Sequence, residues 1–89
     1  LKNILFRSNI IMLPVDNWYI KEDPNMPTST YFYQNNIKVI KSIMPLGEVR
    51  CFIEVIDTKT GKTLECLANH HTNIEDALIQ ANALLEIGV

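Results

Sequence analysis

Residues 48–88 read EVRCFIEVIDTKTGKTLECLANHHTNIEDALIQANALLEIG and decide the fold of this 89-residue chain. Residues 48–56 alternate between two faces with a period of two, which predicts a strand. Gly61 supplies a turn residue that tolerates positive φ. Residues 63–69 return as a second strand, and residues 73–87 repeat apolar side chains at helical spacing. The stretch therefore predicts a β-hairpin followed by one amphipathic helix.

The register of this hairpin follows from matching apolar side chains across the two strands. A four-residue loop, 58–61, sets each apolar residue of one face opposite another apolar residue. A three-residue loop would place Glu54 opposite Cys66 and break that match. We therefore expect the four-residue loop, which gives these facing pairs: Asp57 with Lys62, Val55 with Leu64, Ile53 with Cys66, and Cys51 with Ala68.

The helix carries signals for both of its ends. Thr72 and Glu75 have the spacing of a capping box, which predicts Thr72 as the N-cap. Gly88 is a typical residue after the last helical turn. The helix is expected to cover the sheet face that holds Val49, Cys51, Ile53, Val55, Leu64, Cys66 and Ala68, through one stripe made of Ile74, Ala77, Leu78, Ala81, Leu84 and Leu85.

The N-terminal part of the chain also favours strands. Residues 3–13 are rich in β-branched and apolar side chains. Residues 30–44 are either a hairpin turning at Asn35-Asn36 or one long strand with a bulge, and we favour the hairpin because Asn tolerates positive φ. The fold class is therefore α+β: a small antiparallel sheet of three to five strands with one C-terminal amphipathic helix packed on one face. We expect one domain over residues 1–89, with residues 1–13 as a peripheral strand segment.

Composition and charge exclude several classes. The net charge is −2, and residues 63–89 contain four acids and no Lys or Arg, so neither a nucleic-acid nor a membrane partner is implied by charge alone. The longest apolar run is too short to span a membrane, and Arg7 interrupts the stretch that a signal peptide would need. Two cysteines are too few for a disulfide framework, which favours a reducing compartment, the cytoplasm.

The strongest candidate for chemistry is His70-His71, which with Cys66 could offer metal ligands. A zinc site needs three or four ligands, and adjacent residues on a strand point in opposite directions. We therefore expect a polar junction, with a pH-sensitive contact as the alternative, and no metal or cofactor. Cys51 and Cys66 are diagonal neighbours in the expected register, too far apart for an unstrained disulfide, and are expected to be core thiols.

The sheet face that the helix leaves free predicts a partner. It carries Phe52, Ile56 and Leu67 between charged residues, and exposed aromatic side chains are enriched at protein interfaces. We expect a non-enzymatic protein-binding or regulatory module, or a homodimer, whose partner-binding residues are Trp18, Tyr19, Tyr31, Tyr33, Phe52 and Leu67. The alternative is nucleic-acid binding through Lys38, Lys41, Arg50 and the stacking rings of Tyr31 and Tyr33.

Two families share part of this pattern. Two strands followed by a capped helix resemble the C-terminal half of a HicB-type antitoxin domain. The resemblance is carried by the start of the helix, residues 72–81, which read Thr-Asn-Ile-Glu-Asp-Ala-Leu-Ile-Gln-Ala. The Pro- and Gly-rich segment that this family has before the helix is absent. The order of strands and helix also resembles a double-stranded-RNA-binding domain. That family places lysines at the start of its last helix, where this chain has Glu75 and Asp76, which repel phosphate. Neither resemblance assigns a functional residue.

Overall fold

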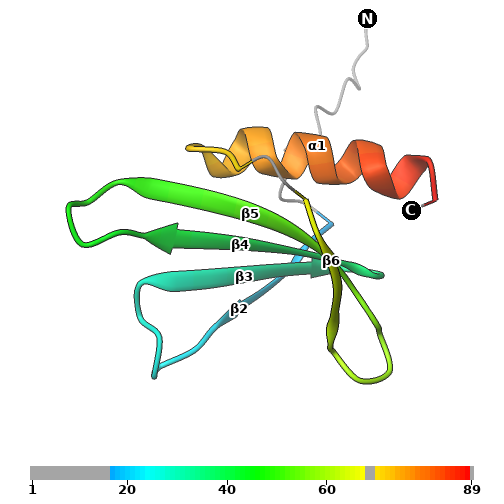
Figure 1. Cartoon of the computed structure of the whole chain (residues 1–89), viewed down its shortest axis with the longest axis horizontal. Helices are drawn as coiled ribbons and strands as arrows, with labels where there is room; N and C mark the ends of the chain where they lie inside the picture. The colour runs from blue at the N-terminus through cyan, green and yellow to red at the C-terminus, as the bar shows by residue number, and fades with distance from the viewer. Residues whose placement is uncertain (1–16, 68–69, 89) are drawn as a thin grey trace, which may run out of the picture.

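The computed structural model describes residues 17–67 and 70–88, and it shows an α+β fold. Five strands form one antiparallel sheet, and a helix near the C-terminus packs on it, as the sequence predicts (Figure 1). The strand expected within residues 1–13 lies outside the described residues. The elements are β2 (Tyr19–Glu22), β3 (Ser29–Gln34), β4 (Ile37–Ile43), β5 (Val49–Ile56), β6 (Thr63–Cys66) and α1 (Ile74–Glu86), and the strand order is β2-β3-β4-β5-β6.

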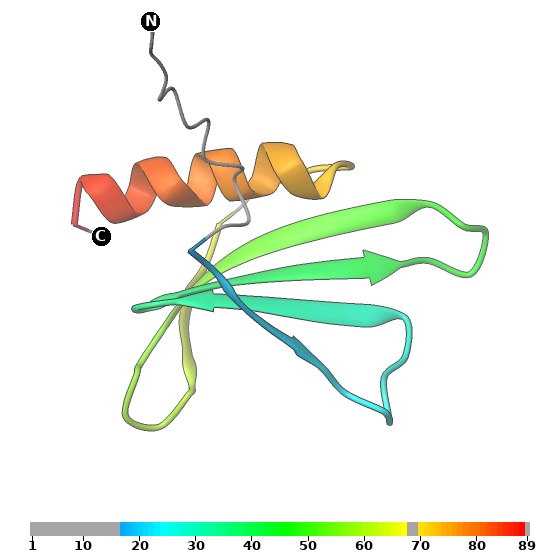
Figure 2. The same ribbon diagram turned by 180° about the vertical axis from the view of Figure 1, so that it is seen from behind.

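The helix lies along one face of the sheet and contacts β4 and β5 (Figures 1 and 2). This contact forms the core, because the apolar stripe of α1 meets the inward side chains of the strands. The predicted stripe is confirmed, since Ala77, Leu78 and Ala81 are buried and its other members are partly buried. From the sheet, the core takes Phe32, Ile37, Val39, Cys51, Ile53 and Val55.

Two tight turns set the order of the strands. Asn35 has φ 52° in the two-residue turn between β3 and β4, so the predicted hairpin is confirmed. The predicted four-residue loop between β5 and β6 is also present. The backbone N–H of Asp57 donates to the carbonyl of Lys62 at 2.9 Å, and Gly61 takes φ 76°.

The register predicted beyond that loop is wrong. A bulge shifts the pairing by one residue, so that Glu54 faces Cys66 and Val55 faces Glu65. Leu64, the extra residue, is 67% exposed. The shift is stabilised because it brings Leu67 opposite Ile53, whose carbonyl accepts the Leu67 N–H at 3.0 Å. The predicted pairs Val55–Leu64 and Ile53–Cys66 therefore do not form. Ala68 lies outside the described residues, and Cys51 pairs instead with His71.

The helix begins one residue later than predicted. Asn73, not Thr72, is the N-cap: its Oδ1 accepts from the backbone N–H groups of Glu75 at 2.7 Å and Asp76 at 3.4 Å. Asn is among the strongest N-cap residues, which explains why it displaces the neighbouring threonine. The predicted glycine stop is confirmed, since Gly88 follows the helix with φ 80°.

Candidate binding surface

The side of the sheet opposite α1 is the candidate surface, and we call it the outer face. No described element covers it (Figures 1 and 2). Successive side chains of a strand point to opposite sides of the sheet. Phe32, Val39 and Ile53 are buried in the core, so their neighbours along each strand point to the outer face. The strand registers place on the outer face Tyr19, Lys21, Tyr31, Tyr33, Lys38, Ile40, Arg50, Phe52 and Glu54.

Aromatic rings lie close together at the β2–β3 side of the outer face. The ring centroids of Tyr19 and Tyr33 are 6.4 Å apart, and the two residues are cross-strand partners. The Lys38 ammonium lies 5.1 Å from the Tyr31 ring centroid and 5.9 Å from that of Tyr33. A cation over a ring is attracted to its negative face. This group therefore combines flat apolar surface with a positive charge.

Farther across the outer face, Ile40 and Phe52 are cross-strand partners on β4 and β5. Both are half-buried, although no described element packs over them. The Phe52 ring lies 6.1 Å from the ring of His70. The apolar surface therefore extends from β2 to β5.

The charged groups of the outer face are mostly basic. Lys21, Lys38 and Arg50 lie on it with Glu54. Arg50 pairs with Glu48 in the neighbouring turn at 3.0 Å, but both side chains are about half exposed (44% and 55%), and such pairs contribute little stability. Arg50 is therefore able to exchange this partner for another acid.

The Glu54 carboxylate is engaged at the β6 edge. It accepts a hydrogen bond from Thr63 Oγ1 at 2.9 Å and one from Cys66 Sγ at 3.6 Å. Partial desolvation, followed by the charge and hydrogen bond of Glu54, raises the pKa of the Cys66 thiol. The acid is thus oriented toward β6 and away from Lys21 at the opposite edge of the sheet.

Four of the six predicted partner-binding residues come together on this face: Tyr19, Tyr31, Tyr33 and Phe52. The placement of Trp18 is wrong, because its side chain is 7% exposed and belongs to the core under α1. The placement of Leu67 is also wrong, because the β6 bulge turns it toward the core. Lys21 and Ile40 were missed, although alternation from Tyr19 along β2 and from Lys38 along β4 would have found both.

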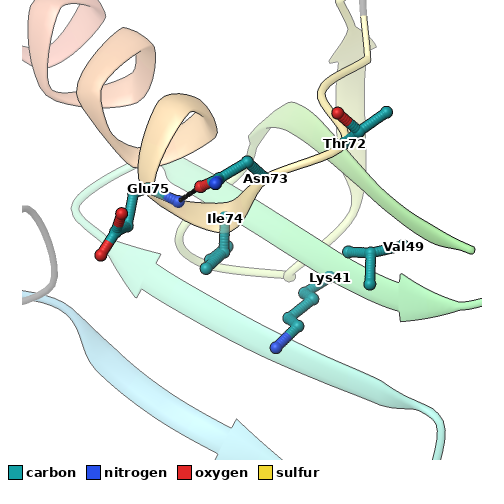
Figure 3. A pocket seen from close by; sticks show the side chains of 6 residues that line it. All are labelled: Lys41, Val49, Thr72, Asn73, Ile74 and Glu75. Atoms are coloured by element: carbon teal, nitrogen blue, oxygen red, sulfur yellow. Dashed lines mark hydrogen bonds between the residues drawn. The ribbon is translucent and has the colours of Figure 1, made fainter.

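The basic residues predicted for nucleic acid do not share one face. Lys38 and Arg50 lie on the outer face, but Lys41 lies on the helix side, beside the start of α1. Figure 3 shows the open pocket there, of about 240 Å³, with the Asn73 side chain turned back to the backbone nitrogen of Glu75. The pocket is lined by Lys41, Val49, Thr72, Asn73, Ile74 and Glu75. Separating Lys41 from Tyr31 and Tyr33 weakens the nucleic-acid alternative.

The two histidines point to opposite sides of the sheet, as expected for neighbours in an extended segment. His70 lies beside Phe52, whereas the His71 ring nitrogen Nε2 shares a hydrogen bond with Gln80 of α1. The backbones of His71 and Cys51 exchange two hydrogen bonds, at 2.7 and 2.9 Å. His71 thus joins the segment before α1 to both the helix and β5.

The cysteines occupy different environments. Both are free thiols, and Cys51 is buried as predicted. The prediction of a core position for Cys66 is wrong, since the bulge exposes it. Burial raises the pKa of the Cys51 thiol, and the nearby Lys41 charge lowers it in part. Within residues 17–67 and 70–88, no group of three His, Cys, Asp or Glu side chains could hold a metal ion.

Comparison of the chain with protein-family models, with characterised proteins and with solved structures gives no match. In the part of the chain that the structure describes, no helix has the length and apolar character needed to cross a membrane.

Proposed function

We propose that this chain is a small, non-enzymatic, cytoplasmic binding module that contacts a protein partner through its outer face. The observation that carries this proposal is the row of partly exposed aromatic and apolar side chains on a sheet face without a described cover: Tyr19, Tyr31, Tyr33, Ile40 and Phe52. An antiparallel sheet can leave one face in water, but a solvated face does not need this many rings.

The chemistry of these residues favours a protein partner. Tyr, Phe and Arg are enriched in protein interfaces, because rings bury large area at low entropic cost and a tyrosine hydroxyl can remain hydrated. Tyr19 is 67% exposed, so its ring has surface left to bury. The cytoplasmic assignment is supported by the two free thiols, one of them exposed.

Nucleic acid is the second candidate, and one observation favours it. Lys38 lies over the rings of Tyr31 and Tyr33, which places a phosphate-binding group beside two stacking surfaces. Lys21 adds a charge in the same region, since it pairs with Tyr31. The separation of Lys41 leaves fewer phosphate contacts than this function usually uses.

The proposal is tested with the double variant Tyr31→Ser/Tyr33→Ser and the control Leu46→Ser. Leu46 is 98% exposed in the β4–β5 turn, so its variant also removes apolar surface but leaves the outer face intact. Affinity capture from lysate of the native cell should recover a protein with the wild type and with the control, and lose it with the double variant. Equal recovery by all three would contradict the proposal.

The nucleic-acid candidate is tested in parallel by fluorescence anisotropy with a labelled single-stranded oligonucleotide at two salt concentrations. Phosphate contacts make the affinity fall steeply with salt. If the wild type binds the oligonucleotide in a salt-sensitive way and Tyr31→Ser/Tyr33→Ser does not bind it, the partner is nucleic acid and not a protein.

A further inference from the structure

Within residues 17–67 and 70–88, no element packs on the solvent side of α1, and the charge of this side is opposite to that of the outer face. Asp76, Ile79, Ala83 and Glu86 recur at helical spacing on this side, and all four are exposed. Ile79 is 57% exposed, which is high for a large aliphatic side chain. The helix contains three acids and no Lys or Arg. We call this set the helix ridge: an apolar centre with acids at each end.

The outer face has the complementary arrangement. Its centre is apolar, at Ile40 and Phe52, and its basic side chains lie toward the sides, with Lys21 on edge strand β2 and Arg50 on β5. Lys38 lies between them. Glu54 is the cross-strand partner of Lys38 on this face, and its carboxylate is turned toward β6, where it accepts hydrogen bonds from Thr63 and Cys66.

The two surfaces also have similar dimensions. Asp76 and Glu86 are ten residues apart in the helix, which corresponds to about 15 Å at 1.5 Å per residue. Lys21 and Arg50 lie on strands separated by three steps of the sheet, which also corresponds to about 15 Å. One acid at each end of the ridge can therefore reach one base at each side of the outer face.

From this match we propose that the chain associates with itself head to tail: the helix ridge of one copy packs on the outer face of the next. The inference rests on the proposed function, since it uses the outer face for protein contact. Ile79 would lie against Ile40 and Phe52, and the small side chain of Ala83 lets the helix approach the sheet. Each inner copy would then have its sheet covered on both faces.

A face-to-face dimer is the less favourable use of the same surface. A two-fold axis would bring the outer faces of two copies together, so that basic side chains oppose basic side chains. The contact between ridge and sheet brings acidic side chains next to basic ones. It is also heterologous, because it joins two different surfaces, so it builds a ring or an open chain of copies and does not stop at a dimer. Because a single helix face is small, we expect a dissociation constant in the micromolar to millimolar range.

The test uses one variant for each surface. The sheet variant, Lys38→Glu/Arg50→Glu, reverses two charges of the outer face and leaves the ridge intact. The helix variant, Ile79→Gln/Ala83→Gln, replaces the apolar centre of the ridge with a good helix former and leaves the outer face intact. The control, Lys59→Glu/Lys62→Glu, makes the same charge change in the exposed β5–β6 loop. Circular dichroism establishes that each variant is folded.

Analytical ultracentrifugation should show that the average mass of the wild type and the control rises with concentration and falls with added salt. Either surface variant alone should associate at least about tenfold more weakly. Mixing the two variants should restore association but stop it at a 1:1 complex. In that complex the intact ridge of the sheet variant docks on the intact outer face of the helix variant, and no second contact can form.

Several outcomes would overturn the head-to-tail inference. A wild type that remains a monomer at millimolar concentration excludes it. A closed dimer that the sheet variant breaks and the helix variant leaves unchanged shows face-to-face association. A mixture of the variants that stays monomeric while the wild type associates also contradicts the ridge-on-sheet contact. The wild type could also be monomeric while the Tyr31→Ser/Tyr33→Ser variant no longer captures a cellular protein that the wild type binds. That result would support the proposed function and exclude self-association.

Discussion

Trp18 and Asn82 are joined across most of the chain: the indole Nε1 donates a hydrogen bond to Asn82 Oδ1 at 3.1 Å, although the two residues are 64 positions apart. The Trp18 ring is buried beside the core residues of α1. The contact therefore fixes the helix over the sheet by packing and by a hydrogen bond together.

Removing this bond should weaken the fold without changing its shape. Trp18→Phe keeps an aromatic ring but loses the donor, and we expect the free energy of unfolding to fall by about 1–2 kcal/mol. Trp18→Ala also removes the packed ring and should cost about 3–5 kcal/mol. Urea titration followed by circular dichroism measures both. Tyr19→Phe is the matched control, because Tyr19 is exposed; a cost as large as that of Trp18→Phe would argue against the buried anchor.

The start of α1 allows a test between adjacent residues. Asn73→Ala removes the acceptor of two backbone N–H groups and should reduce stability by about 1 kcal/mol. Thr72→Ala should change stability by less than about 0.5 kcal/mol, because Thr72 is exposed and does not cap the helix. Thermal and urea unfolding of the two variants give the comparison. If Thr72→Ala costs more stability than Asn73→Ala, Thr72 is the N-cap, as the capping-box spacing predicts.

The bulge in β6 predicts unequal costs for two aliphatic truncations. Ile53→Ala creates a cavity in the core and should cost about 2–5 kcal/mol. Leu64→Ala should change stability by less than about 0.5 kcal/mol, because its side chain is mostly exposed. Chemical denaturation of each variant measures the difference. In the uninterrupted register both side chains would face α1, so a cost above about 2 kcal/mol for Leu64→Ala would exclude the bulge.

The two thiols should differ in their rates of alkylation. Cys66 is exposed and should react with iodoacetamide, whereas Cys51 should react only on unfolding. The raised pKa of Cys66 lowers its thiolate fraction at mildly alkaline pH. Glu54→Gln removes the negative charge, so the pKa should fall and the alkylation rate at fixed pH should rise. Mass spectrometry of the peptides containing each cysteine, over a pH series, gives both rates. An unchanged Cys66 rate in Glu54→Gln would show that Glu54 does not act on the thiol.

The elements could be predicted because their signals are local. The alternation in β5, the Asn35-Asn36 turn and the helical stripe each depend on neighbours within a few residues, and all three appear in the structure. The bulge could not be predicted in this way. An inserted residue changes the local conformational free energy of a strand very little. The bulge is favoured because it lets Leu67 pack on the core, and that packing depends on a contact between two strands.

The candidate surface was predicted in part for the same reason. Period-two alternation places Tyr31 and Tyr33 together, but it does not say that Trp18 turns under the helix, because that position depends on Asn82 near the other end of the chain. Lys38 and Lys41 are three positions apart on β4, so alternation alone places them on opposite faces, and Lys41 shares the side of buried Val39. Long-range packing therefore decided the position of Trp18, whereas the separation of Lys41 from Lys38 is a local property of the strand.

The irregular step in β6 has a consequence for how the chain tolerates changes in length. Thr63 faces Ile56 and Glu65 faces Val55, so Leu64 is the one residue between them without a partner on β5. Deleting Leu64 would make Thr63 and Glu65 neighbours on a regular strand, and the Glu54–Cys66 pair would be kept. The hairpin should therefore tolerate the loss of one residue at this site, because the side chains that follow it remain on the same sides of the sheet.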